Sequence, residues 1–237
     1  MANQDYVSDE LSHFVGRGKN PDDQCHLLIE IVKSGCLKAP RSELISGEKI
    51  VQSKILEVRG NADFSSGEMY RPMVVCFCDI PIDDASLRIH TSKYSKFGLS
   101  FLKDFIVGKG GSPVLYLPRA ARDASEIPLD QYFDEMVKGY HQFSAAVENL
   151  QDANLLDQLL ALRRFLDFRI FSFIKFHDHT LSDGDPNNFY MEREWRVNDS
   201  VKFTTEDICK IICPRDYEEK VKAGLQTISD DKFLLIE

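Results

Sequence analysis

Short runs of β-branched and aromatic residues, bounded by glycine and proline, recur along this chain and predict β-strands. The clearest run lies at Met73–Ile80, is rich in valine and phenylalanine, and ends before Pro81, which predicts a central, buried strand. Apolar residues at 97, 99 and 101 alternate with small or polar ones, as in a strand with one buried face. Further strands are predicted at Leu11–Arg17, Pro113–Pro118, Ile208–Pro214 and Phe233–Ile236.

Apolar residues three and four positions apart predict helices in three other parts of the chain. The spacing from Cys25 to Val32 is helical, with Asp22 and Asp23 as candidate N-caps and Gly35 where a helix ends. A second helix is predicted at Tyr217–Leu225. The largest helical region, residues 129–177, predicts an insertion of two or three helices.

An aromatic stripe runs through the end of this insertion. Such a stripe could clasp a flat ligand, but helix packing is the commoner reason for it, so we interpret these residues as core. They are Phe165, Phe168, Phe171, Phe173 and Phe176.

Taken together, the elements predict an α+β fold, a mixed, twisted sheet of short strands with a helical insertion at 129–177. Residues 38–71 are polar and should form loops with short strands, and Asp83 and Asp84 are placed to cap a short helix from Leu87 to His90. A length of 237 residues favours a single domain. The alternative is two packed subdomains, with the helices forming their own unit.

The charge balance limits the partners of the protein. A net charge of −9 argues against broad binding to nucleic acid or anionic lipid, although a local basic pocket could hold a phosphate group. No apolar run approaches the roughly 20 residues that span a bilayer, which predicts no membrane span. The segment Met1–Asp5 has no secretory character, so we expect a cytoplasmic protein.

The six cysteines lie mostly within apolar segments and are predicted to be reduced core thiols. Their spacing does not favour zinc, because Cys76 and Cys78 would point to opposite faces of a strand. The segment His177-Asp178-His179, with Asp183 and Asp185 nearby, is of metal-ligand type but is interpreted as a solvated loop. We therefore predict no metal site. The motifs of serine hydrolases and P-loop enzymes are absent, and Gly108–Ser112 reads as a turn.

The most unusual stretch is Phe189–Val197, which contains two glutamates, two arginines and the only tryptophan of the chain. If it is extended, Glu192, Glu194 and Arg196 point to one face and Trp195 to the other. Two neighbouring carboxylates can raise the pKa of one of them into a range useful for acid or base catalysis, an effect that Arg196 would oppose. A solvated strand face with paired charges is the alternative interpretation.

Other parts of the chain supply residues that would complement these glutamates. His13 lies on the first predicted strand, Phe77-Cys78-Asp79 ends a buried one, and Tyr94 and Lys96 precede another. If these strands converge on one cleft, a histidine, an aromatic ring and a carboxylate suit a nucleotide ligand.

Four segments resemble the motifs of the AbiGi family of bacterial abortive-infection proteins: Ser8–Arg17, Val75–Pro81, Lys93–Phe101 and Glu192–Val197. The resemblance covers most of the chain outside the helical insertion. It implies a role as the antitoxin half of a phage-defence pair, with a cognate toxin or a phage-derived protein as partner.

A more distant resemblance is to ADP-ribosyltransferases, whose pattern ends in a Glu-x-Glu or Gln-x-Glu strand. It implies an ADP-ribosyltransferase-like fold with NAD as the substrate and a protein or nucleic acid as acceptor. By this resemblance His13 holds the nicotinamide ribose, Glu194 is the catalytic carboxylate and Glu192 orients the acceptor. His13 and Glu194 should then open into the same cleft, with Trp195 buried on the opposite face.

The same resemblance implies further cofactor-binding residues. Tyr94 would substitute for the ring-stacking tyrosine, Arg196 would pair with a phosphate or carboxylate, and Phe14 and Phe77 would line the cleft. Cys78 stands where the family has serine or threonine. Two hypotheses follow, an NAD-dependent transferase or glycohydrolase and a non-catalytic antitoxin that binds a partner protein.

Overall fold

The computed structural model describes residues 8–39, 51–52, 56–59, 62–81, 91, 93–119, 127–147, 151–182, 185 and 188–237. These residues divide into two compact units. The first, called the sheet unit, comprises Met1–Ala39, Val75–Pro113 and Met191–Glu237, and the second, called the helix unit, comprises Pro40–Val74 and Val114–Tyr190. That the two units form a single domain stays a prediction.

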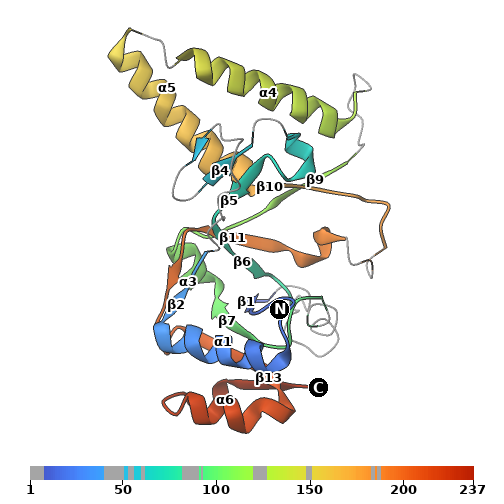
Figure 1. Cartoon of the computed structure of the whole chain (residues 1–237), viewed down its shortest axis with the longest axis vertical. Helices are drawn as coiled ribbons and strands as arrows, with labels where there is room; N and C mark the ends of the chain where they lie inside the picture. Colours follow the sequence, from blue (N-terminus) through green and yellow to red (C-terminus); the bar gives the residue numbers. More distant parts are fainter. Residues whose placement is uncertain are drawn as a thin grey trace, which may run out of the picture. The chain divides into compact units, whose positions relative to one another are not determined.

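The sheet unit contains a mixed seven-stranded sheet with the order β14-β13-β7-β1-β6-β11-β8. Figure 1 labels β13, β7, β1, β6 and β11 of this sheet. Strands β13 and β14 are parallel, whereas β1 is antiparallel to β6 and β7, β7 to β13, and β8 to β11. Their bounds are β1 Glu10–Phe14, β6 Val74–Cys78, β7 Gly98–Leu102, β8 Ser112–Pro113, β11 Glu194–Asn198, β13 Ile208–Pro214 and β14 Phe233–Ile236. A separate two-stranded ladder pairs β2 (Cys36–Leu37) with β12 (Val201–Lys202).

One face of this sheet forms the main hydrophobic core. Leu11 of β1 lies opposite Phe101 of β7, Leu99 lies opposite Ile211 of β13, and all four side chains are fully buried. Three helices pack side chains into the same core, namely α1 (Pro21–Ser34), α3 (Lys103–Gly108) and α6 (Glu218–Gly224). Helices α1 and α6 lie side by side (Figure 1). Burial of apolar area against these helices, at about 25 cal/mol per Å², holds the sheet in place.

Helix α1 shows how local sequence sets an element's ends. Its N-cap is Asn20, whose side-chain oxygen accepts a hydrogen bond from the backbone N–H of Asp23 at 3.0 Å. The prediction that Asp22 and Asp23 are the N-cap is therefore wrong. These two carboxylates lie in the first turn instead, where the helix dipole favours negative charge. Gly35 ends the helix in a left-handed conformation, as predicted.

The helix unit contains two small sheets and two long helices. Strands β3 (Val51–Gln52), β4 (Leu56–Val58) and β5 (Tyr70–Pro72) form an antiparallel sheet, and β9 (Leu115–Pro118) pairs in parallel with β10 (Ile174–His177). The helices are α4 (Leu129–Val147) and α5 (Ala153–Phe165). Phe64 is at the centre of this unit's core, with the rings of Tyr70 and Phe171 5.5 Å away.

Most predicted strands are confirmed, and the departures lie between residues 113 and 177. The predicted strand 113–118 is two strands in different sheets, β8 and β9. The helical region 129–177 ends in a π-helix at Leu166–Ile170, a 3-10 turn at Phe171–Phe173 and strand β10. Other 3-10 turns are Phe64–Ser66, Phe189–Glu192, Arg215–Tyr217 and Asp230–Lys232. The predicted helix at 87–90 with its Asp caps lies outside the described residues.

Two predictions about core side chains were wrong. Phe165 is 54% exposed, although Phe171, Phe173 and Phe176 are buried as expected. All six cysteines are free thiols, but Cys76 is exposed, because its side chain lies on the face of β6 opposite the core residue Phe77. The prediction that the thiols of Cys76 and Cys78 point to opposite faces is wrong as well, because residues two positions apart on one strand share a face. Burial raises the pKa of the Cys213 thiol to about 12.

Gly35 offers a test of the packing beside α1. An added Cβ would lie 2.7 Å from the carbonyl oxygen of Phe203, whereas at Gly18, also left-handed, it would meet nothing within 4 Å. We expect Gly18→Ala to cost about 1 kcal/mol from backbone strain alone and Gly35→Ala at least about 1 kcal/mol more. Urea unfolding followed by Trp195 fluorescence measures both, and equal losses would contradict the predicted clash.

Candidate functional site

The stretch that contains both glutamates is not one continuous strand. Glu192 ends a 3-10 turn, Arg193 has a φ of +43°, and β11 begins only at Glu194. The backbone N–H of Asp79 donates to the Arg193 carbonyl at 3.2 Å. The prediction that Glu192 and Glu194 alternate along one extended strand is therefore wrong, because the chain turns between them.

Strand alternation places the predicted site residues on two faces of the sheet. On β11, Val197 belongs to the main core and Trp195 packs against it, so Glu194 and Arg196 point to the opposite face. On β1, Leu11 belongs to the same core, so His13 points to the core face. The structure therefore does not bring His13 and Glu194 together. Trp195 does lie opposite Glu194, but it is only partly buried.

His13 and Phe77 both have structural contacts on the core face. The Nδ1 of His13 lies 2.7 Å from the Cys76 carbonyl oxygen, which identifies Nδ1 as the protonated donor. Burial lowers the pKa of His13, so the ring is neutral near pH 7. Phe77 is 1% exposed and packs edge-on against Phe101. Neither the buried Phe77 ring nor the hydrogen-bonded edge of His13 is open to a ligand.

Glu192 lies in a buried polar cluster with two other side chains. The Tyr94 hydroxyl donates a short hydrogen bond to Oε1 of Glu192, and Lys93 Nζ lies 3.0 Å from the same oxygen. Burial and then this hydrogen bond raise the pKa of Tyr94 well above its ordinary value, so the phenol stays protonated and keeps donating. The carboxylate of Glu192 thus contacts both an ammonium group and a phenol hydroxyl.

Aromatic and basic side chains surround Tyr94. The ring of Phe14 stacks parallel to it at a centroid distance of 6.3 Å, and the Arg17 guanidinium lies 5.1 Å from the ring centre. The Cys78 thiol is close enough to contribute to the raised Tyr94 pKa. Of the predicted site residues, the structure thus gathers Phe14, Cys78, Tyr94 and Glu192, which we call the Tyr94 cluster.

Glu194 forms a second, separate pair with Arg196. The guanidinium Nε lies 2.8 Å from Oε1, and a second nitrogen lies 3.3 Å from Oε2, which is a bidentate ion pair. The two side chains are 7% and 13% exposed. Each glutamate therefore pairs with a different cation.

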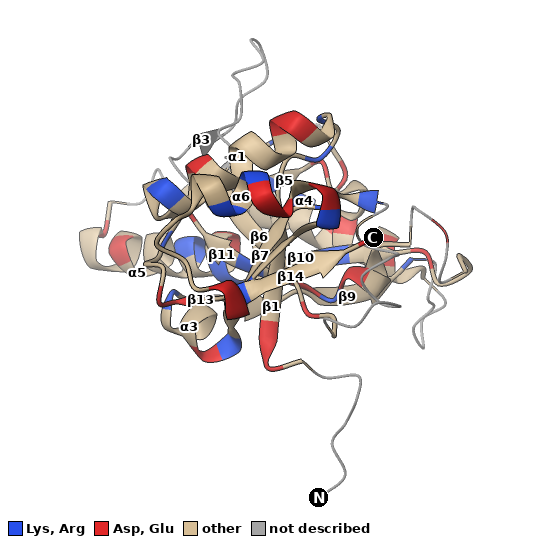
Figure 2. Cartoon of the chain, turned by 90° about the horizontal axis from the view of Figure 1, so that it is seen from below, with Lys and Arg blue, Asp and Glu red and all other residues tan. Residues whose placement is uncertain are grey.

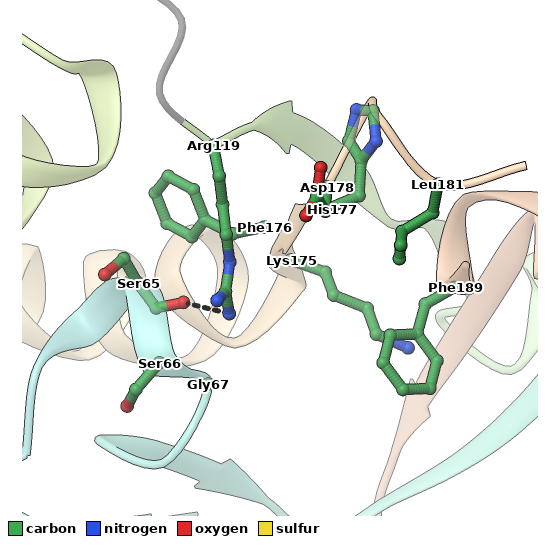
Figure 3. Close-up of a pocket in the computed structure, with 10 residues that line it drawn as sticks. All are labelled: Ser65, Ser66, Gly67, Arg119, Lys175, Phe176, His177, Asp178, Leu181 and Phe189. Atoms are coloured by element: carbon green, nitrogen blue, oxygen red, sulfur yellow. Dashed lines mark hydrogen bonds between the residues drawn. The ribbon is translucent and has the colours of Figure 1, made fainter. Parts of the chain in front are cut away.

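A cavity of about 400 Å³ lies within the helix unit, where the sequence predicted no binding residues (Figure 3). It is lined by Ser65–Gly67, Arg119, Lys175–Asp178, Leu181 and Phe189. Near this cavity, the sequence pattern singles out the segment His177-Asp178-His179, which it predicts to be a solvated loop. Arg119 and Lys175 carried no signal, because single cations beside short strands are common in any soluble protein.

Among the residues that the structure describes, no group of three or more His, Cys, Asp and Glu side chains could hold a metal ion. Within the same residues, no helix has the length and apolar character needed to cross a membrane.

Residues 49–226 match the model of a family described as "Putative abortive phage resistance protein AbiGi, antitoxin". The chain belongs to the AbiGi family. The match covers three quarters of the chain, includes the helical region 129–177, and starts after the first strand and α1. The resemblance seen in the sequence was therefore correct in family but differs in extent. No curated protein and no solved structure matches the chain.

The buried pair of Glu192 and Lys93 can be tested by stability measurements. We expect Glu192→Leu to cost about 3 kcal/mol, because it removes the carboxylate that lies 3.0 Å from the ammonium of Lys93, whose side chain is 14% exposed. Adding Lys93→Met should recover part of that loss. Urea unfolding of the single and double variants measures both effects.

A matched control is Lys220→Met, which removes an exposed pair with Asp22 in the same unit. It should cost at most about 1 kcal/mol. A double variant no more stable than Glu192→Leu alone would show that the broken ion pair with Lys93 is not the source of the loss.

Proposed function

We propose that this AbiGi-family chain is a non-catalytic antitoxin that neutralises a cognate toxin by binding it as a protein. The observation that carries the proposal is the family match over residues 49–226, whose description names an antitoxin. A cytoplasmic location, as the sequence predicts, suits a protein that acts on a toxin inside the infected cell.

The geometry of the sheet unit favours binding over catalysis. The transferase hypothesis needs His13 and Glu194 in one cleft, but they lie on opposite faces of the sheet. The carboxylates of Glu192 and Glu194 are each held in a buried ion pair, which is typical of a structural role. NAD binding is the competing proposal, and it would have to use the Tyr94 cluster without His13.

The strongest candidate for the toxin-binding surface is α5 of the helix unit. This helix contains five leucines and one phenylalanine, yet none of its residues is buried. Leu155, Leu159 and Leu162 fall four and three positions apart, so they line one side of the helix. Leu166, the next leucine at this spacing, belongs to the π-helix and packs against the core of the helix unit. Leu162 is 52% exposed and Leu155 43%. Contiguous exposed apolar surface of this kind marks interaction sites.

Helix α4 adds to the same candidate surface. Its residues Tyr132, Met136 and Phe143 are four and seven positions apart and are all exposed. A groove of about 80 Å³ between α4 and α5 is lined by Phe143, Leu159 and Leu162, among others. Grooves with leucine and aromatic walls accept the apolar face of a partner helix, and we propose that the toxin supplies such a face.

Charge is consistent with this proposal but does not locate the surface. The net charge of −9 suits a protein that masks a basic partner. Figure 2 shows both signs of charge along α6, where Glu218 and Glu219 are followed by Lys220 and Lys222. We therefore base the choice of surface on exposed apolar residues.

Neutralisation of the toxin can be measured directly. We expect the chain to be harmless when expressed alone and to restore growth when expressed with the toxin encoded beside it. Leu162→Asp should abolish the rescue and weaken binding at least roughly thirtyfold, as for a hot-spot residue of at least 2 kcal/mol. Growth curves and titration calorimetry with the purified pair measure the two effects.

The matched control is Leu102→Asp, which changes a leucine of equal exposure, 51%, in the sheet unit. It should rescue growth as well as the unchanged chain. If both variants rescue equally, α5 is not the binding surface, and if the unchanged chain arrests growth by itself, the antitoxin proposal is wrong.

The competing proposal predicts a different result with NAD. On our proposal, calorimetry and product chromatography should detect neither NAD binding nor NAD consumption, because no His–Glu cleft is formed among the described residues. NAD turnover that Glu194→Gln lowers by roughly a hundredfold or more would establish the transferase instead.

A further inference from the structure

Helix α5 continues without a break into the core of the helix unit. Its last residue, Phe165, and Leu166, which begins the π-helix Leu166–Ile170, both have right-handed helical backbone angles. Within this π-helix, Leu166 and Phe168 pack against the core and Asp167 is buried, whereas no residue of α5 itself is buried. Helices bend at π-helical turns, so this segment is the joint that sets the direction of α5.

A hydrogen-bond network crosses this joint. The Tyr140 hydroxyl of α4 lies 3.2 Å from Oδ1 of Asp167, in the π-helix, and 3.3 Å from the carbonyl oxygen of Arg163, in the last turn of α5. The Nε of Arg163 lies 3.7 Å from Oδ2 of Asp167, and both side chains are mostly buried. One hydroxyl of α4 thus contacts the helix on both sides of the joint.

The rest of the network fixes Asp167 within the unit. Its Oδ1 also accepts a hydrogen bond from the Tyr70 hydroxyl of β5 at 3.0 Å, and its backbone carbonyl accepts one from the Ser172 hydroxyl at 2.6 Å. Because the single hydroxyl proton of Tyr70 goes to Asp167, Nε2 of His141, 2.9 Å from the same oxygen, carries a proton and donates it. Burial raises the pKa of Tyr70 and Tyr140, so both hydroxyls stay protonated.

These five side chains, which we call the Asp167 network, are Tyr70, Tyr140, His141, Arg163 and Asp167. We propose that the Asp167 network locks the joint and so holds the exposed leucines of α5 in the direction that the toxin recognises. Tyr70 and Asp167 are buried, so they act on the toxin through α5 and are positioning residues. The role in recognition rests on the proposed toxin binding by α5, whereas the lock itself does not.

The lock affects binding through the fraction of molecules that present α5 correctly. When only a fraction of a protein is in the binding-competent conformation, its apparent affinity falls in proportion, and the loss is in the association rate. The dissociation rate stays the same, because the contacts in the complex are unchanged. Removing a contact residue acts differently, since it mainly raises the dissociation rate. A change in the lock can therefore be distinguished from a change in the surface.

The test uses two full-length variants that alter different bonds of the network. Tyr140→Phe removes the hydroxyl that bridges the joint, and Asp167→Asn removes the charge that pairs with Arg163. A helix of 13 residues released from α4 is marginal in water, so its amides exchange with solvent. Hydrogen exchange in the free variants should be about threefold to tenfold faster in α5, as expected for one lost hydrogen bond, and unchanged in β9 and β10.

Surface plasmon resonance with the purified toxin gives the second measurement. The association rate of both variants should fall at least roughly twofold, but by no more than the factor by which exchange accelerates, because both follow the same opening of α5. Their dissociation rates should not change. Leu162→Asp, which alters the surface and not the lock, should instead raise the dissociation rate.

The matched control is Tyr190→Phe, which removes an exposed tyrosine hydroxyl of the same unit outside the network. It should change neither exchange nor either rate. The proposal is wrong if neither network variant exchanges faster in α5, if β9 and β10 accelerate by the same factor, or if the dissociation rate rises instead. Failure of the proposed function is visible separately, because the toxin would then not bind the unchanged chain, while exchange in the free protein still tests the lock.

Discussion

The burial of one face of the seven-stranded sheet determines the placement of every candidate residue in the sheet unit. Leu11, Leu99, Phe101 and Ile211 must all face α1 and α6, and their register fixes the side on which each neighbour lies. A slip of one residue would exchange the two faces completely. His13 is two residues from Leu11 on the same strand, so it must lie on the core face of the sheet whenever Leu11 does.

This constraint explains which predictions from the sequence succeeded. The strands β6, β7, β13 and β14 were predictable because each is an apolar run bounded by turn residues, and α1 because its periodicity and Gly35 agree. The pairing partners were not predictable, because order in the sheet is set by contacts between segments far apart in the chain. Without that order, nothing in the sequence could show that β1 and β11 present His13 and Glu194 to different faces.

The glutamates of the sheet unit and the cavity of the helix unit also differ in how far the sequence could predict them. Glu192 and Glu194 drew attention because they are neighbours in sequence, yet the positive φ of Arg193 separates them and gives each a different cation. The sequence could not predict that Arg119 and Lys175 line one cavity, because they are 56 positions apart and the pairing of β9 with β10 brings their segments together. The net charge of the chain was equally uninformative, because it does not show where charged side chains come together in the fold.

The exposure of α5 should shorten the lifetime of the free protein in the cell. A helix of 13 residues is marginal by itself in water, and α5 has its Asp152 cap but no buried residue to add tertiary stabilisation. We therefore expect its amide hydrogens to exchange early, through local opening that costs far less than global unfolding. Such opening exposes leucine-rich chain to proteases, so a partner that covers α5 would also protect the protein from degradation. The abundance of the protein in a cell would then follow the supply of that partner.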